Sequence, residues 1–167
     1  MEPSDAELVA AANRGDRQAF EALYRRHRDW VVSLAYRFCG NRDDALDVLQ
    51  ETFLYVLKKL PRLELRSRFT TFLYPAVKHL ALGRRRLAHR HAPLPEGEVT
   101  AGMEHLPGDV RGLLVGASAL QREILMLRFA DGLDLKEIAE VLRVPLGTVK
   151  SRLHNALKAL KKKLREE

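Results

Sequence analysis

Apolar residues recur every three or four positions along most of this 167-residue chain. That spacing places them on one face of an α-helix, whereas a half-buried strand would alternate apolar and polar residues, and no segment does so. Three apolar stripes follow one another, at residues 20–38, 45–60 and 69–81. A shorter capped helix is expected before them, ending near Gly15, and the second stripe stops at Pro61. The sequence therefore predicts an all-α fold.

The helical pattern is interrupted between residues 91 and 109. This stretch, "HAPLPEGEVTAGMEHLPGD", is rich in proline and glycine and has no sustained periodicity, which is typical of a linker. Helical spacing returns after it, in one helix that should end at Gly132 and in two further helices. We expect two small helical domains, at residues 1–90 and 110–167, joined by a flexible linker at residues 91–109.

Positive charge is concentrated in two segments of a chain whose formal net charge is +7. Residues 62–90 contain eight basic residues against Glu64 alone, and residues 142–164 contain seven basic residues and no acid. A solvated face explains a single basic run more often than a binding site does. Two runs, each next to a recognisable motif, favour a nucleic-acid partner.

Three other features bear on where the protein works. No apolar run approaches the ~20 residues of a membrane span. The first residues are acidic and polar, unlike the basic start and apolar run of a signal peptide. Cys39 is the single cysteine, so no internal disulfide is possible, and we expect it to be a small buried apolar residue rather than a reactive thiol. These features together predict a cytoplasmic protein.

The stretch from Leu135 onward has the spacing of a helix-turn-helix. Ala139 is small where two helices must approach closely, and the break at "RVP" lets the second helix leave at a steep angle. In such a unit the early residues of the second helix enter the major groove, where Arg and Lys pair with guanine edges and Asn with adenine. The residues expected to fill the small core are Ile138, Leu142, Val149 and Leu153, and those expected to face DNA are Thr148, Lys150, Ser151, Arg152, His154 and Asn155.

Two further expectations concern the same unit. Lys158, Lys161, Lys162 and Lys163 lie further along the second helix and should meet phosphates or solvent. Arg143 occupies the turn, where many helix-turn-helix units have glycine, and a left-handed backbone there would cost ~1–2 kcal/mol. The alternative interpretation is an ordinary helical hairpin with a solvated lysine face.

With both helical regions in view, the chain resembles an extracytoplasmic-function sigma factor, the compact class of the sigma-70 family of bacterial RNA polymerase. The resemblance covers nearly the whole chain, and its most specific stretches are "DALDVLQETF" and "GTVKSRLHNALKAL". It implies a dissociable specificity subunit that recognises a promoter and helps to melt it. The first domain would bind core RNA polymerase and the minus-ten element, and the second would bind the minus-thirty-five element. An anti-sigma factor is the further implied partner, and no small-molecule substrate is implied.

The resemblance implies that the helix at residues 44–59 docks on the clamp helices of the largest polymerase subunit. Asp47, Gln50 and Glu51 would make its polar contacts. Their spacing of three and four residues places them on about one helical face, so that acid and amide groups are presented together. A solvated face opposite the apolar stripe is the alternative.

The resemblance further implies that residues 63–71 form a loop that holds a base flipped from the minus-ten element. Opening duplex DNA costs free energy for each base, so a pocket and a basic cradle are needed to hold the open strand. Plain core packing is the alternative for Phe69. The residues implied to contact this DNA are Arg66, Arg68 and Phe69 in the loop, and Lys78, His79, Arg84, Arg85 and Arg86 on the next helix.

The chain departs from the family pattern on that next helix. The family usually has Trp where this chain has Phe72, Asn where it has His79, and Asp where it has Gly83. Pro75 also falls in this helix, and we expect it near the first turn, because a mid-helix proline costs about 3 kcal/mol. We expect these changes to relax the selection of minus-ten bases and to increase the share of phosphate contacts.

Two other functions stay open on sequence grounds: a sigma-like decoy that binds an anti-sigma factor without reading promoters, and a helix-turn-helix regulator of transcription. The basic residues between positions 62 and 90 argue against the decoy. An enzyme is not expected, because the chain has no phosphate-binding glycine loop, nucleophile elbow or metal-ligand cluster. His89, His91 and His105 lie in or beside the linker without a matching Cys or acid cluster, so we expect neither a metal nor another cofactor.

Overall fold

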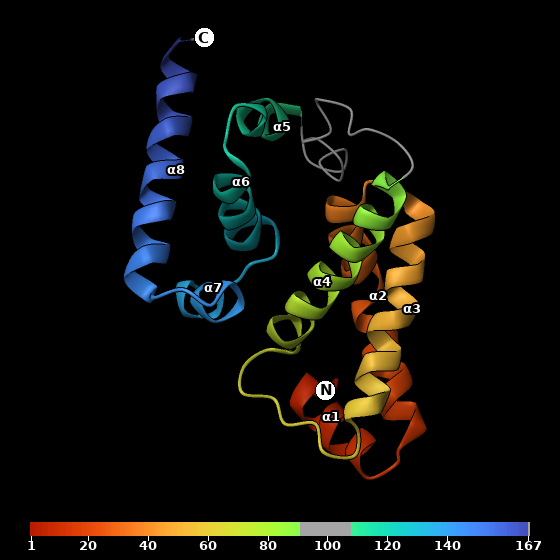
Figure 1. Cartoon of the computed structure of the whole chain (residues 1–167). Coiled ribbons are helices and arrows are strands. Elements are labelled where there is room, and N and C mark those ends of the chain that lie inside the picture. The colour runs from red at the N-terminus through yellow and green to blue at the C-terminus, as the bar shows by residue number, and fades with distance from the viewer. Residues whose placement is uncertain (91–107, 167) are drawn as a thin grey trace. The chain divides into compact units, whose positions relative to one another are not determined.

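The computed structural model of this chain describes residues 1–90 and 108–166 (Figure 1). All regular secondary structure in these residues is helical, so the predicted all-α fold is confirmed. None of the helices described there is long and apolar enough to cross a membrane.

The chain divides into two compact units, Met1–Gly102 and Met103–Glu167. Most of the predicted linker, residues 91–107, lies outside the described residues. Its last two residues already belong to a helix, α5, which begins at Gly108. Helix α5 is additional to the three helices that the sequence predicted after the linker.

Capping residues set the helix ends of the first unit. Ser4 and Glu7 form a reciprocal capping box at the first helix. Asp16 and Asn41 cap the next two helices, because their side-chain oxygens accept hydrogen bonds from first-turn N–H groups. Gly40, with φ 83°, ends the second helix in the left-handed conformation that glycine adopts without strain. The helices are α1 (Asp5–Asn13), α2 (Arg17–Cys39), α3 (Arg42–Lys59) and α4 (Phe69–His89).

The core of this unit is centred on α2, which packs against α1, α3 and α4, while α3 also packs against α4. Residues of all three predicted apolar stripes are buried there, among them Leu23, Val48 and Val77. Leu57 is an exception, because its side chain is 46% exposed on α3. Cys39 is buried as predicted; its thiol donates a hydrogen bond to the carbonyl of Asn41 at 3.3 Å, and burial raises its pKa.

Pro75 lies in the second turn of α4, not in the first turn as the sequence suggested, because α4 already begins at Phe69. A proline at this position cannot donate to the carbonyl of Thr71, four residues earlier. The helix nevertheless continues to His89, and Pro75 is exposed, so its ring takes no space from the core.

In the second unit, α8 packs against α5, α6 and α7. Capping boxes start two of these helices, through Ser118 at α6 and Asp134 at α7. Ile124, Ile138 and Val149 are fully buried between them. The helical elements are α5 (Gly108–Val115), α6 (Ala119–Leu125), the π-helical segment η2 (Met126–Ala130), α7 (Leu135–Leu142) and α8 (Leu146–Glu166).

The predicted helix that should end at Gly132 does stop there, but its last turn widens into the π-helical segment η2. The N–H of Asp131 donates to the carbonyl of Met126 at 2.9 Å, five residues back rather than four. Gly132 then takes φ 69°. The wider turn leaves Phe129 65% exposed while Leu127 is fully buried.

Candidate nucleic-acid and protein interfaces

The turn between α7 and α8 has the geometry of a helix-turn-helix. Arg143 takes φ 52° and ψ 47°, the left-handed conformation predicted for this position. The N–H of Val144 donates to the carbonyl of Ala139 at 3.1 Å, which closes the end of α7. At the start of α8, the N–H groups of Thr148 and Val149 donate to the carbonyl of Pro145, at 3.0 and 3.2 Å. These bonds fix the direction in which α8 leaves the turn.

The predicted DNA-facing residues of α8 divide into two groups. Lys150, Ser151, His154 and Asn155 are exposed, whereas Thr148 and Arg152 are half-buried. The hydroxyl of Ser151 donates to the carbonyl of Thr148 at 3.0 Å, within the helix.

Two positions on the opposite face orient α8. Val149 is fully buried and Ala156 is 1% exposed. Because these residues hold the inner face, the exposed residues in the first turns of α8 are free to meet a groove edge.

The basic end of α8 does not present all its lysines to solvent. Lys158 and Lys161 are exposed, and the ammonium of Lys162 lies 3.9 Å from the carboxylate of Glu166. Lys163 is half-buried, and a Cβ added at Gly116 would come within 1.9 Å of its Nζ. Lys163 therefore packs on the segment just after α5 and is less exposed than Lys158 and Lys161.

On α3, Asp47 and Gln50 are exposed and Glu51 is half-buried. Leu46, Leu54 and Leu57 are exposed on this helix as well. They lie on one side of it, because eight residues separate Leu46 from Leu54 and three separate Leu54 from Leu57. The sequence analysis did not identify these three leucines as surface residues. Leu46 and Leu54 fall outside the apolar stripe of this helix, and that position could have indicated their exposure. An exposed face that combines leucines with acid and amide groups is typical of a protein-binding surface.

Arg84 of α4 contacts this acidic part of α3. Its guanidinium donates to the carboxylate of Asp47 at 3.0 Å and to that of Glu51. The hydrogen bond to Glu51, together with both negative charges, raises the pKa of Arg84. Arg84 was expected on a DNA-facing surface, but the structure places its charged group between two carboxylates of its own chain.

The segment from residue 63 to residue 71, predicted as a loop, leads into α4 and passes beside α1 (Figure 1), but its last three residues already form the first turn of α4. Arg66 and Arg68 are exposed in it. Phe69 is fully buried, with its ring centroid 4.9 Å from that of His27 and 6.0 Å from that of Phe72. The alternative of core packing therefore describes Phe69, and its ring has no free face for a base in this conformation.

Further along α4, the predicted residues again differ in exposure. His79 and Arg86 are exposed and Arg85 is half-buried. The ammonium of Lys78 lies 5.7 Å from the ring centroid of Phe38, within cation–π range. A Cβ added at Gly83 meets no atom within 4 Å, so neither space nor backbone requires glycine there.

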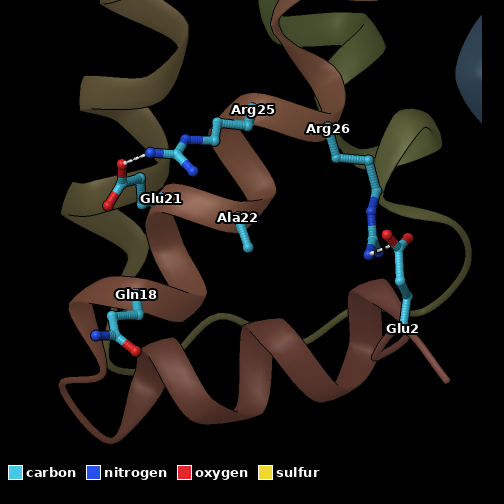
Figure 2. Close-up of a pocket in the computed structure, with 6 residues that line it drawn as sticks. All are labelled: Glu2, Gln18, Glu21, Ala22, Arg25 and Arg26. Atoms are coloured by element: carbon cyan, nitrogen blue, oxygen red, sulfur yellow. Dashed lines mark hydrogen bonds and ion pairs between the residues drawn. The ribbon is translucent and has the colours of Figure 1, made fainter.

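An open pocket of about 640 Å³ lies beside α2, and its lining residues include none of the predicted site residues (Figure 2). Arg25 pairs with Glu21 at 2.5 Å and Arg26 pairs with Glu2 at 3.7 Å, so cations and acids balance in its wall. This balance gives the pocket no electrostatic preference for an anion or a cation. The lining residues are Glu2, Gln18, Glu21, Ala22, Arg25 and Arg26.

Comparison with known protein families places matches on both units. The family described as sigma-70 region 2 matches residues 23–91, and that described as sigma-70, region 4 matches residues 118–160. The extracytoplasmic-function (ECF) RNA polymerase sigma factor SigW of Bacillus subtilis is 30% identical, over 99% of this chain and 100% of the relative. The ECF RNA polymerase sigma factor SigM of Mycobacterium tuberculosis is 34% identical, over 93% of this chain and 82% of the relative.

Two solved structures share the fold. CnrH, in complex with the cytosolic domain of CnrY, matches with a TM-score of 0.72 and 24% identity, over 99% of both chains. The sigma factor RpoE of Bartonella quintana, in complex with the anti-sigma factor NepR, matches with a TM-score of 0.63 and 21% identity, over 87% of this chain and 96% of that one.

Proposed function

Because this chain belongs to the sigma-70 family of bacterial RNA polymerase, in its extracytoplasmic-function class, we propose that its two units divide promoter recognition between them. The protein is a sigma factor that directs promoter-specific initiation of transcription with core RNA polymerase. It would act as a non-catalytic subunit, in the cytoplasm where the polymerase works. Two exposed surfaces carry this proposal, one on each unit. Helix α8 begins with exposed polar residues, and α3 has an exposed face of acid, amide and leucine side chains.

In this proposal α8 reads the minus-thirty-five element in the major groove. Lys150, His154 and Asn155 offer donors and acceptors for base edges, and all three are exposed. Arg152 is half-buried and would reach the groove from the edge of the helix. Lys158 and Lys161, further along, would contact phosphates.

The face of α3 would dock on the polymerase. Its acids suit a basic partner surface, and Leu46, Leu54 and Leu57 supply the apolar area that desolvated centres of interfaces contain. Arg84 would lie at the edge of this face, because it contacts Asp47 and Glu51.

The 63–71 loop and the exposed side of α4 would contact the open minus-ten element. Arg66, Arg68, His79 and Arg86 are the exposed candidates. Since Phe69 is buried, the loop would hold a flipped base through its backbone, its arginines and its half-buried positions rather than by stacking on that ring.

We also propose control by an anti-sigma factor. Two structures of similar fold were solved with a bound partner, and in one of them the partner is described as an anti-sigma factor. A partner that covers the leucines of α3 would block polymerase docking directly.

The test is transcription from genomic fragments with purified core polymerase and the full chain. We expect specific start sites that disappear when Asp47, Gln50 and Glu51 are all changed to Ala, with the helical circular dichroism unchanged. Asp29→Ala, an exposed acid on α2, is the control and should retain full activity. Binding of wild type to core polymerase without any specific transcript would contradict the proposal and would favour the decoy.

A further inference from the structure

Helix α1 is linked to both ends of the 63–71 segment, directly at Leu63 and through α2 at Phe69. At the first end, the side-chain amide of Asn13, the last residue of α1, bonds the backbone of Leu63 in both directions. Asn13 Nδ2 donates to the Leu63 carbonyl at 2.8 Å, and the Leu63 N–H donates to Asn13 Oδ1 at 3.2 Å. One side chain thus satisfies both backbone groups of a buried residue, as a neighbouring strand would.

At the second end, α1 acts through α2. Asp5, the first residue of α1, accepts a hydrogen bond from His27 Nε2 at 2.9 Å, and the His27 ring packs on Phe69. Arg26 also donates to Asp5 at 2.7 Å and to the carbonyl of Pro3 at 2.9 Å. Burial alone would raise the pKa of Asp5, but its bonds to Arg26 and His27 outweigh burial and lower it. The carboxylate is therefore charged and fixed beside the ring that supports Phe69.

Between these two ends, the backbone of residues 64–67 has little support of its own. Within the described part of the chain, residues 64–67 take no part in any backbone–backbone hydrogen bond. Leu65 and Ser67 are half-buried, while Glu64 and Arg66 point to solvent. The shape of the loop consequently depends on where Leu63 and Phe69 are held.

We propose that α1 is a template for the 63–71 loop, holding it in the shape that accepts an unpaired minus-ten base, with Asn13 and the Asp5–His27 pair as positioning residues. The inference rests on the function proposed above. A loop that is ordered before it meets DNA spends less of its binding energy on becoming ordered. Loss of either anchor should therefore weaken base capture while leaving α3 and α8 intact.

The experiment uses the full chain in complex with core polymerase, at concentrations that saturate the complex. Asn13→Ala should slow open-complex formation about ten-fold, since it removes two hydrogen bonds to a buried backbone, each with an effect of a few-fold. In a promoter library randomised across the minus-ten element, it should flatten the preference at the one position held by the loop. The preferences at the minus-thirty-five element should not change.

Two variants separate positioning from mere stability. Ser4→Ala removes the capping box of α1 but neither anchor, and α1 keeps its packing on α2, so this variant should lower stability while the base preference stays sharp. Asp5→Asn keeps the shape of the side chain but removes its charge beside His27, so it should flatten the same library position, by a smaller factor. If Asn13→Ala does not fold, this variant decides the question.

The outcomes are distinct. The template is supported if Asn13→Ala or Asp5→Asn flattens one minus-ten position and Ser4→Ala does not. It is overturned if Ser4→Ala has the same effect as Asn13→Ala, or if all three variants keep the wild-type preference. Absence of specific transcripts with wild type would instead overturn the proposed function itself.

Discussion

Helices α4 and α8 are both basic, both 21 residues long, and both assigned to DNA by their sequences, yet they hold their charges differently. On α4, Arg84 is bound by carboxylates of α3 and Lys78 lies over an aromatic ring. On α8, Lys150, His154 and Asn155 are exposed in the first turns. The difference comes from the neighbouring helices, because α3 brings Asp47 and Glu51 to α4. A basic residue predicts an anionic partner only once the acids of its own fold have been placed.

The largest expected effect tests whether Phe69 belongs to the core. Phe69→Ala should lower the free energy of unfolding by about 3–5 kcal/mol, because it leaves a cavity between His27 and Phe72. Chemical denaturation measures this change. Phe129→Ala, an exposed phenylalanine of the second unit, should cost far less. Unchanged stability together with an altered minus-ten preference would return Phe69 to the DNA-binding residues.

The next effect concerns base contacts on α8. Lys150→Ala and Arg152→Ala should each weaken binding to the minus-thirty-five element by ~1–3 kcal/mol and relax its sequence preference. Lys162→Ala should weaken binding about equally on all sequences. Selection from a randomised upstream element distinguishes these patterns. An altered preference for Lys162→Ala, beside an unaltered one for Arg152→Ala, would reverse the assignment.

A smaller effect is expected in the turn before α8. Arg143→Gly should raise the stability of the second unit by ~1 kcal/mol, because glycine adopts the left-handed conformation at φ 52° without strain. Arg143→Ala keeps the Cβ and should bring no such gain. Thermal unfolding of the full chain compares the two, and equal midpoints would show that the turn carries no strain.

Arg84→Ala sharpens the comparison more directly, with a smaller change in stability. The side chains of this ion-pair cluster are partly exposed, at 33% for Arg84, 51% for Asp47 and 38% for Glu51. Solvent screening should therefore keep the loss in free energy of unfolding below about 1 kcal/mol. Promoter binding by the complex with polymerase should keep its salt dependence, whereas Arg86→Ala should reduce the salt slope by about 1. Equal reductions would mean that Arg84 leaves its carboxylates to contact phosphate.

The smallest effect is one of selectivity. Neutral imidazole offers one donor and one acceptor on opposite sides of a ring, and cannot make the paired contact that an amide makes with a base edge. Exposed His79 should therefore select minus-ten bases less strictly than Asn, so His79→Asn should sharpen selection in a randomised library. If wild type already selects minus-ten bases as sharply as this variant, His79 does not relax the selection.

Patterns repeated along the sequence predicted much of this molecule. The apolar stripes identified α2, α3 and most of α4, and the helix-turn-helix spacing identified the position of the left-handed turn, although Arg143 stands there in place of glycine. The inner face of α8 also followed from spacing, because Val149 packs inward.

The remaining features depend on residues far apart in the sequence. Neither the contact of Arg84 with α3 nor the bond of Asn13 to Leu63, fifty positions away, leaves a local signal. The same is true of Lys163, whose contact beside Gly116 arises only when α5 packs on α8. Sequence reasoning identified the described helices other than α5 and most of their buried faces, but not the partners of individual polar side chains.

The burial of Cys39 has a practical consequence for spectroscopy. As the chain's single cysteine, with a buried thiol whose pKa is raised, it should react slowly with maleimide dyes. Cysteines introduced at exposed Asp29 and Lys162 would then take a donor and an acceptor dye, one on each unit, without removal of the native residue. Energy transfer between the dyes would report the separation of the two units, free in solution and bound to polymerase, in the otherwise native chain.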